Sequence, residues 1–295
     1  MKTNKLCIVL YLLLGACVED IDIENKWEQK IVVNCTLDTS SVQILKLTYS
    51  NPLGVHYYDE VETATVSLYE DSSMLGHFTK TAYAHWELKY RPRAGKSYQL
   101  KVEVPEHKEI RASTTMPFPL QISKANGNDS GTRKHLNQKM ANSPYWLFIL
   151  RQKKSEQYPM NLTPQVSASD ELENQLGTNH PFSDHFNISD PAESFIKQPF
   201  DMYIRIETPE EKAETPHDFY IEGRLSKCLL FCRAASPEYD RYLKSSIQKI
   251  LVYEASEDPS QWFDENEVYS NIENGLGIFA AYSDHILMYD DDWGI

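Results

Sequence analysis

Residues 30–50 read KIVVNCTLDTSSVQILKLTYS, which is two short apolar runs separated by small polar residues. The first run, 30–38, is rich in β-branched residues, and the second, 42–50, partly alternates apolar with polar side chains. β-Branched content and a period of two are typical of half-buried β-strands. The stretch therefore predicts two consecutive strands.

The same pattern recurs to about residue 115. Turn signals such as Asn51-Pro52 and Asp71-Ser72-Ser73 separate the runs. The further runs, rich in Val, Tyr and Thr, lie at 62–70, 85–90, 98–106 and 109–117. Strands at roughly ten-residue spacing, with no Gly-rich phosphate loop and no βαβ alternation, favour an antiparallel sandwich. We predict an Ig-like antiparallel β-sandwich over residues 30–118.

A second β-rich domain is predicted from residue 119 to residue 295. Pro117 and Pro119 cannot both continue a central strand, so we place the domain boundary there. Two polar segments, 123–140 and 152–198, are predicted to be long loops. The runs predicted to be strands lie at 146–150, 200–207 and 219–234. The fold class is thus mainly β, with one main helix.

That helix is predicted near residues 237–251. Ser236 is a suitable N-cap, Pro237 suits the first helical position, and Glu238 and Asp240 suit the positive end of a helix. Apolar side chains then recur at helical spacing, at Tyr239, Tyr242, Leu243, Ile247, Ile250 and Leu251. Such a stripe predicts packing against the core rather than a cofactor site.

Residues 268–283, VYSNIENGLGIFAAYS, predict a turn and a closing strand. Asn274-Gly275 favours a tight turn, and Gly275 and Gly277 permit a positive φ or a close backbone approach. The apolar run 278–282 then predicts the strand.

The N-terminus, MKTNKLCIVLYLLLGACVED, has a positive start and a short apolar run, 6–14. As a helix this run reaches about 14 Å, roughly half of a hydrocarbon core about 30 Å thick, so it is too short to span a membrane. A positive start followed by a short apolar run predicts a secretory signal peptide over residues 1–16. Residues 14–17, LGAC, resemble the bacterial lipobox, which predicts a lipidated Cys17 and a tether over 17–29. The alternative is an ordinary signal peptide with an incidental cysteine.

Two acidic residues follow this cysteine. Glu19 and Asp20 resemble the signal that sends Bacteroidetes lipoproteins to the cell surface, and Val18 stands where inner-membrane retention signals have Asp. The alternative is that the two acids begin a polar tether. We expect a lipid-anchored outer-membrane protein that faces the cell exterior, because several acyl chains together anchor a protein stably.

The chain of 295 residues is acidic, with a mean hydropathy of −0.51. Without residues 1–16, which hold two lysines and no acid, the formal charge changes from −14 to −16. Such a surface repels phosphates, which excludes nucleic acid as a partner. It also repels anionic lipid, so we expect attachment to the membrane through the acyl chains.

Three cysteines remain once Cys7 leaves with the signal peptide and Cys17 is lipidated. An odd number gives no complete disulfide framework. On one strand Cys228 and Cys232 would lie about 13 Å apart, beyond the reach of a disulfide, and no matching His/Cys pair indicates zinc. We predict that these two residues and Cys35 are small buried apolar side chains.

The order of these features resembles a known family. The motifs are LGAC at 14–17, TATVSLYE at 63–70, SYQLKVEVP at 97–105, SPEYDRYL at 236–243 and SNIENGLGIF at 270–279, the last being the most specific. Over nearly the whole chain they resemble a family of Bacteroidetes outer-membrane lipoproteins of unknown function (DUF4249), whose genes commonly neighbour TonB-dependent receptors. Asn34-Cys35 departs from the family, which usually has an acidic residue and a glycine there. The resemblance implies a location and a TonB-dependent receptor as partner, and it supplies no catalytic residues.

No group of residues in the sequence indicates a particular reaction. The chain has no GxSxG elbow, and its histidines lack the HExxH spacing. His180, His185 and His217 are predicted to be exposed loop residues, and we assign no catalytic residue, metal or cofactor. Among the tryptophans, Trp86 alternates with apolar strand residues and is predicted to pack in the core, whereas Trp262, in a polar loop, is the candidate for stacking on a sugar.

We therefore expect a non-enzymatic accessory subunit of a TonB-dependent nutrient transporter. A stand-alone surface module that binds glycans or mediates adhesion is the alternative, and exposed aromatic side chains in a shallow groove would favour it. An enzyme, such as a hydrolase, would instead require a deep pocket with converging histidines and carboxylates.

Overall fold

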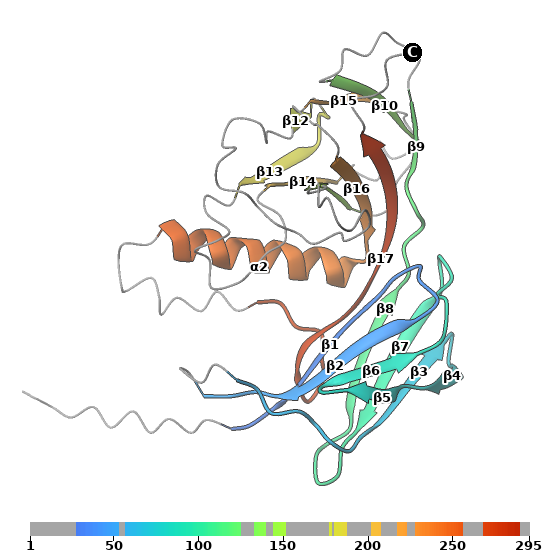
Figure 1. Ribbon diagram of the computed structural model, residues 1–295, viewed down its shortest axis with the longest axis vertical. Helices are drawn as coiled ribbons and strands as arrows, with labels where there is room; N and C mark the ends of the chain where they lie inside the picture. Colours follow the sequence, from blue (N-terminus) through green and yellow to red (C-terminus); the bar gives the residue numbers. More distant parts are fainter. Residues whose placement is uncertain are drawn as a thin grey trace, which may run out of the picture.

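The computed structural model describes residues 28–52, 57–124, 133–139, 144–151, 177–178, 180–187, 202–207, 217–222, 228–255 and 268–289. In these ranges the chain is mainly β and has one α-helix, which confirms the predicted fold class. Figure 1 shows the N-terminal strands β1–β8 gathered at one end and the helix α2 with the C-terminal strands at the other.

Two sheets pack over one apolar core at the N-terminal end. The first contains, side by side, β1 (Ile31–Leu37), β2 (Gln43–Tyr49), β6 (His85–Leu88) and β5 (Thr79–Ala82). The second contains β4 (Ser73–His77), β3 (Thr65–Glu70), β7 (Ser97–Glu103) and β8 (Ile110–Thr115). Alternate residues of both sheets enter the core, among them Val33, Leu45, Leu68 and Leu100. The six strands predicted for this region are confirmed, and β4 and β5 are additional.

Strand β17 (Leu276–Tyr289) joins the two ends of the molecule. Its first half pairs in parallel with β1, and its second half pairs antiparallel with β16 (Cys228–Ala235). The predicted closing strand is therefore present. The predicted second domain, residues 119–295, includes this strand, but the first half of the strand extends the N-terminal sheet.

Both faces of β17 are buried where it leaves the sandwich. Phe279 and Ala281 belong to the sandwich core, whereas Ile278 and Ala280 belong to a second core beside α2 (Pro237–Ala255). A strand that is buried on both faces shows a continuous apolar run instead of an alternation. This double burial explains why residues 278–281, IFAA, are apolar throughout.

Two glycines let the chain run close to β1 at this point. A Cβ atom on Gly275 would lie 2.9 Å from the carbonyl oxygen of Ile31, and a Cβ atom on Gly277 would collide with the carbonyl group of Val33. Gly277 also has a φ of 105°, and Asn274 has a φ of 59°. The predicted turn and the predicted close approach are both confirmed.

The strands β1, β17 and β16 belong to one long sheet, and the helix covers its C-terminal half. Beyond β16 this sheet continues with β11 (Tyr145–Arg151), β14 (Met202–Ile206) and β13 (Ser183–Asn187). Tyr239 and Ile247 of α2 share a core with Trp146 and Phe148 of β11. The helix begins at Pro237 as predicted and ends at Ala255, so it runs past the predicted end at 251.

Ser236 fastens the start of α2 to both cores. Its hydroxyl accepts hydrogen bonds from the backbone amides of Tyr239 and Ala281, each at 3.2 Å. Its own amide donates to the carbonyl oxygen of Ala281 at 2.9 Å, and the Thr114 hydroxyl donates to the Ser236 hydroxyl at 3.1 Å. The predicted N-cap therefore also links the helix to β8 and β17.

Two arginines with little exposure lie between the helix and the sheet. Arg205 donates to both carboxylate oxygens of Asp240, at 2.7 and 2.8 Å, and the indole nitrogen of Trp146 donates to the same carboxylate at 3.0 Å. Arg233 donates to both carboxylate oxygens of Asp284, at 2.7 and 2.8 Å. Arg205 also pairs with the exposed carboxylate of Glu207 at 2.6 Å. Because both cations are largely removed from water, each depends on the carboxylates that pair with it.

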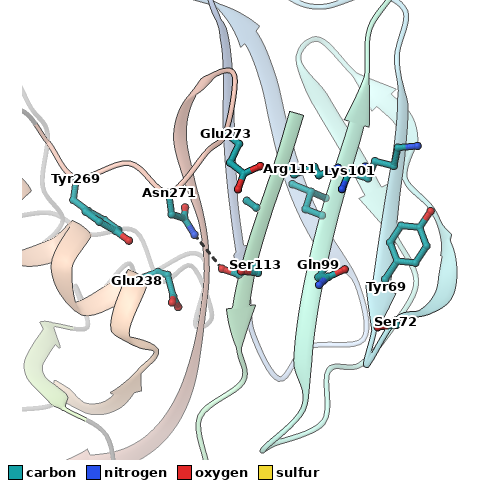
Figure 2. A pocket seen from close by; sticks show the side chains of 12 residues that line it. Tyr69, Ser72, Gln99, Lys101, Arg111, Ser113, Glu238, Tyr269, Asn271 and Glu273 are labelled. Atoms are coloured by element: carbon teal, nitrogen blue, oxygen red, sulfur yellow. Dashed lines mark hydrogen bonds between the residues drawn. The ribbon is translucent and has the colours of Figure 1, made fainter. Parts of the chain in front are cut away.

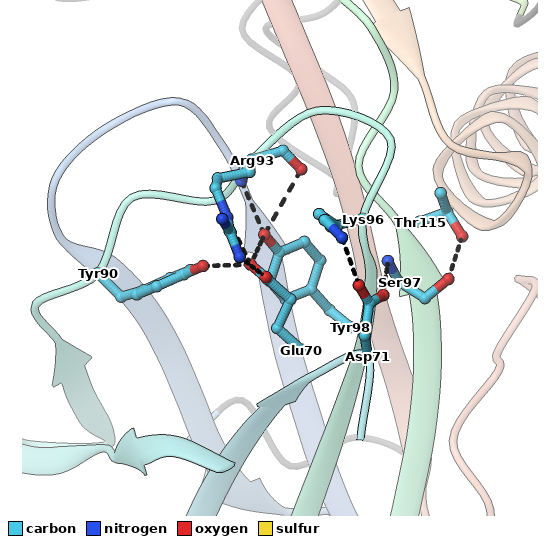
Figure 3. Close-up of polar contacts among 8 residues, drawn as sticks. All are labelled: Glu70, Asp71, Tyr90, Arg93, Lys96, Ser97, Tyr98 and Thr115. Atoms are coloured by element: carbon cyan, nitrogen blue, oxygen red, sulfur yellow. Dashed lines mark hydrogen bonds and ion pairs between the residues drawn. The ribbon is translucent and has the colours of Figure 1, made fainter. Parts of the chain in front are cut away.

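The sandwich holds a buried acid at its rim (Figure 3). Glu70 is 5% exposed and pairs with the guanidinium of Arg93, while the hydroxyls of Tyr90 and Tyr98 donate to it. Arg93 first, and then the two hydroxyls, lower the pKa of Glu70 to about 2. The Arg93 amide also donates to the Tyr98 hydroxyl at 2.7 Å, so this network fastens the turn at residues 91–95 to the sheet.

Two segments that were predicted to be loops contain strands. Within 123–140, β10 (Arg133–Lys139) pairs with β9 (Gln121–Lys124) and with β15 (His217–Glu222), and β12 (Gly177–Thr178) lies beyond β15. The loop prediction is wrong there, because the polar sequence RKHLNQK obtains its backbone hydrogen bonds from a partner far along the chain. The segment 152–198 likewise contains β12 and β13.

Candidate binding groove

A groove lies between the outer face of the sheet β4-β3-β7-β8 and the segment that leads into β17. Its volume is about 650 Å³, and its lining comes from β3, β7, β8, the start of α2 and residues 269–273 (Figure 2). Ligand sites commonly occur where two parts of a protein meet. We therefore take this groove as the candidate site.

Polar side chains of the sheet form one wall. Gln99 and Lys101 of β7, and Arg111 and Ser113 of β8, point away from the core because the residues between them point into it. Tyr69 of β3 stands at the far side of this wall (Figure 2). The alternation of the strands predicts that each of these residues is exposed, but it does not predict that they line one groove.

The two cations of this wall are held by neighbouring carboxylates. The Lys101 ammonium lies 2.8 Å from Glu109 and 3.0 Å from Glu103, and Arg111 also pairs with Glu109. Glu109 is the larger cause of the raised pKa of Lys101, and Lys101 in turn lowers the pKa of Glu109. Lys101, Arg111 and Glu109 are therefore ionised at neutral pH. Exposed pairs of this kind contribute little stability, but they orient the two cations along the groove.

Asn271 holds the opposite wall in place. Its side-chain nitrogen donates to the carbonyl oxygens of Ser113 at 3.1 Å and Phe279 at 2.7 Å, and its side-chain oxygen accepts from the Phe279 amide at 2.9 Å. One side chain thus links β8 to β17, which explains why an asparagine is used here.

The following residues cover the free edge of β8. The Glu273 amide donates to the carbonyl oxygen of Arg111 at 2.9 Å, and the Asn274 side chain donates to that of Glu109 at 2.9 Å. An open strand edge is a site for unwanted pairing with other chains. Residues 271–274 therefore close this edge and at the same time form a wall of the groove.

Glu238 and Tyr269 close one end of the groove (Figure 2). The Glu238 carboxylate accepts a hydrogen bond from the Thr114 hydroxyl at 2.8 Å. The Tyr269 amide donates to the Ser245 hydroxyl at 2.9 Å, and the Arg241 guanidinium lies 5.7 Å from the centre of the Tyr269 ring. Glu238 thus links α2 to β8, and Tyr269 is fastened to α2.

The groove offers hydrogen-bond donors and acceptors, charges of both signs and two tyrosines, and much of this lining is held by other residues. Groups that are already positioned lower the entropy cost of binding a polar ligand. In the described ranges, no group of three or more His, Cys, Asp or Glu side chains is placed to hold a metal ion. The arrangement is suited to recognition of a polar molecule.

The residues on which the sequence placed the anchor and the sugar contact lie outside the described residues. These are Cys17, Glu19, Asp20 and Trp262. Their roles in lipidation, export and ligand binding stay predictions, and the groove is built from other residues.

Two of the three remaining cysteines are buried thiols. Cys35 in β1 and Cys232 in β16 are free and buried, and burial raises the pKa of both. This confirms their prediction as small buried side chains. Cys228 lies on the same strand as Cys232, within the run 219–234 that was predicted to be strand, and its side chain is outside the described part. Trp86 is buried as predicted.

The prediction of exposed loop histidines is wrong. His180 is 3% exposed, and its ring packs edge-on against Tyr145 with the ring centres 6.3 Å apart. Phe182, two residues along the chain, also packs against the His180 ring, with the ring centres 6.1 Å apart. Tyr145 lies on a strand far from His180 in the sequence, so the local sequence did not show this contact. His185 lies in β13 and His217 lies in β15, so neither is a loop residue.

A family model described as a domain of unknown function (DUF4249) matches residues 18–286, which include both sheets of the sandwich, α2 and most of β17. The chain belongs to the DUF4249 family. None of the curated proteins matches it. In its described ranges, this DUF4249 protein has no helix that is both long and apolar enough to cross a bilayer.

The stretch that resembled the DUF4249 family most specifically, 270–279, has a structural role in this protein. It supplies Asn271, which links β8 to β17, and Gly277, where a side chain would collide with β1. The motif therefore shapes one wall of the groove by closing the sandwich.

Proposed function

We propose that this protein is a surface-exposed outer-membrane lipoprotein that serves as a non-enzymatic accessory subunit of a TonB-dependent nutrient transporter. The observation that carries the proposal is the sequence around Cys17, in which LGAC at 14–17 is followed by Glu19 and Asp20.

The short tether supports a partner in the same membrane. Residues 18–27 separate Cys17 from the first described residue, Glu28, and even a fully extended chain of this length reaches at most about 40 Å. A tethered protein meets partners in its own membrane at a high effective concentration, so weak contacts suffice for association. The acyl chains provide the anchor, and the folded part remains free to bind.

The groove supports a binding role for the folded part. Its lining combines Lys101 and Arg111 with Glu238 and Glu273, so it does not favour a strongly charged ligand of either sign. Its polar groups are already positioned by contacts with β8, β17 and α2. Such a groove suits capture of a polar nutrient, or contact with the transporter that imports it.

Affinity purification from gently solubilised outer membranes of the native host tests the proposal. We expect the tagged, lipidated protein to bring down a TonB-dependent receptor in near-stoichiometric amount, identified by mass spectrometry. The Cys17→Ala variant is the control, because it keeps the folded part and loses the anchor. Recovery of the lipidated protein without any receptor would contradict the proposal.

The second candidate is a stand-alone surface module that binds glycans. The observation that favours it is the presence of Tyr69 and Tyr269 in the lining of one polar groove, since tyrosines can stack on sugar rings. A glycan array probed with the wild type and with Tyr269→Ala tests this function, and Tyr83→Ala is a control outside the groove. Trp262→Ala tests the contact predicted from the sequence. An array without hits would contradict glycan binding.

A further inference from the structure

Three exposed tyrosines of the sandwich lie outside the lining of the groove. Tyr57, Tyr58 and Tyr83 are 71%, 53% and 57% exposed, and we call them the tyrosine patch. The rings of Tyr58 and Tyr83 lie with their centres 6.4 Å apart, and the Tyr83 hydroxyl donates to the carbonyl oxygen of Tyr58 at 2.6 Å. Tyrosines in such exposed groups are typical of protein interfaces.

The patch lies where the chain enters the sandwich from its N-terminal tether. The Lys30 amide donates to the Ser50 hydroxyl at 2.9 Å, and Ile31 pairs with Tyr49 across β1 and β2. Tyr49 and Tyr83 line the same pocket, whose volume is about 550 Å³. A lipid on Cys17 would therefore keep this end of the molecule within about 40 Å of the membrane.

Carboxylates line the pocket between these tyrosines. Asp59, Glu60 and Glu62 contribute to it. Glu60 is engaged, because it pairs with Lys80 at 3.1 Å and accepts from the Ala84 amide at 2.7 Å. In the part of the chain that the structure describes, the side chains of Asp59 and Glu62 make no hydrogen bond or ion pair. Two unpaired negative charges beside aromatic rings suit a cationic side chain, which gains both Coulombic and cation–π attraction.

We propose that the tyrosine patch and its acidic pocket are the docking surface for a basic loop of an integral outer-membrane protein. The partner's arginine or lysine side chain enters the pocket beside Tyr49 and Tyr83, and the exposed tyrosines pack around it. This inference rests on the proposed lipid anchor, and it names the face that meets the transporter.

The charge of the patch disfavours the membrane surface itself as the occupant. Tyrosines also occur at the level of lipid head groups, but anionic head groups attract basic segments. Here Tyr49 and Tyr83 line the same pocket as Asp59 and Glu62, and the whole chain carries a formal charge of −14. A protein with a basic loop fits both the rings and the carboxylates.

Photo-crosslinking in the native host tests the surface directly. The lipidated full chain carries p-benzoylphenylalanine in place of Tyr58 or Tyr83, and the control carries it in place of Met74, which is 49% exposed on β4 of the other sheet. We expect both patch positions to form an adduct with the same integral outer-membrane protein, and the Met74 position to form little of it. Adducts with lipid alone, no adduct, or equal yields at all three positions would overturn the proposal.

A charge reversal gives a second readout. We expect Glu62→Lys to lower recovery of the co-purified partner about tenfold, because a like charge then faces the basic loop. Glu87→Lys on β6 is the matched control and should leave recovery unchanged. Equal recovery for wild type and Glu62→Lys would overturn the docking surface.

These outcomes separate this inference from the proposed function. Suppose that the wild type recovers a TonB-dependent receptor, that the patch positions form no specific adduct, and that Glu62→Lys recovers as much partner as the wild type. The docking surface is then wrong, and the proposed function stands. If the adducts contain a different outer-membrane protein, the docking surface stands and the transporter role fails.

Discussion

The two cores on either side of β17 are stabilised differently. The sandwich core is apolar, and its buried acid, Glu70, sits at the rim with its partner Arg93 largely exposed. The core beside α2 instead contains the Arg205–Asp240 pair, with side chains 7% and 10% exposed. The sandwich therefore depends mainly on apolar burial, whereas the attachment of the helix depends on buried charges, which are far more sensitive to loss of one partner.

The largest effect that tests this difference is expected at Asp240. The Asp240→Ala substitution removes the carboxylate that accepts two hydrogen bonds from buried Arg205 and one from the Trp146 indole, and leaves Arg205 only the exposed carboxylate of Glu207 at 2.6 Å and that of Asp184 at 3.5 Å. This loss should cost about 3–4 kcal/mol of unfolding free energy. Chemical denaturation of the full chain in detergent measures this change. Asp240→Asn, which keeps the shape, should lose less, and a loss below about 1 kcal/mol for Asp240→Ala would remove the contrast between the two cores.

The next effect is expected at Glu70, and it depends on pH. The folded protein lowers the pKa of Glu70 from 4.5 to about 2, so the network contributes its full stability above pH 4.5 and loses it as the pH falls toward 2. The contribution at pH 7 is up to about 3 kcal/mol.

Unfolding free energies of wild type and Glu70→Gln at pH 7 and pH 3 measure this contribution. The difference in unfolding free energy between the two proteins should be smaller at pH 3 than at pH 7. Glu103→Gln, at an exposed position of the same sheet, is the control and should show no comparable gap. A gap for Glu70→Gln that is the same at both pH values would contradict the assignment to an ionised Glu70.

A smaller effect is expected at Asn271, which joins the two regions. Asn271→Ala removes three side-chain hydrogen bonds between β8, β17 and their connecting segment, and it should cost about 1–3 kcal/mol. Hydrogen exchange should increase at the Phe279 amide, whose bond to the side chain is lost. Unchanged exchange at Phe279 would show that residues 271–274 do not hold this edge.

The smallest effect is expected at Lys101. Its ion pairs with Glu103 and Glu109 are exposed, so Lys101→Ala should change the unfolding free energy by no more than about 0.5 kcal/mol. The same denaturation experiment measures it, with Lys101→Arg as the conservative control. A loss as large as that of Asp240→Ala would mean that surface and buried pairs contribute alike.

Local patterns predicted the elements whose signals lie within a few residues. Residues 30–38 are rich in β-branched side chains and form β1, and the cap at Ser236 with its apolar stripe begins α2. Strand β10 was missed because its sequence is polar and its partner β15 lies far along the chain. The parallel pairing of β17 with β1 was missed for the same reason. The apolar run 278–281 indicates that both faces of the strand are buried, but it does not indicate which elements bury them.

The groove was harder to predict than the fold. Strand alternation places Gln99 and Arg111 on an outer face, but their convergence with Tyr269 depends on how residues 269–273 cross the end of the sandwich. Within the 270–279 motif the sequence predicted the turn at Asn274-Gly275 and the close approach at Gly277, but it did not predict the contacts of Asn271. Lipidation at Cys17 remains a prediction from the sequence.

The proposed function depends on the lipid anchor at Cys17. The N-terminal peptide of the mature protein tests this anchor most directly. Mass spectrometry of protein isolated from the outer membrane of the native host should find a chain that begins at Cys17 and carries diacylglyceryl and acyl groups on this residue. A mature chain that begins at another residue, or that carries an unmodified Cys17, would contradict the account.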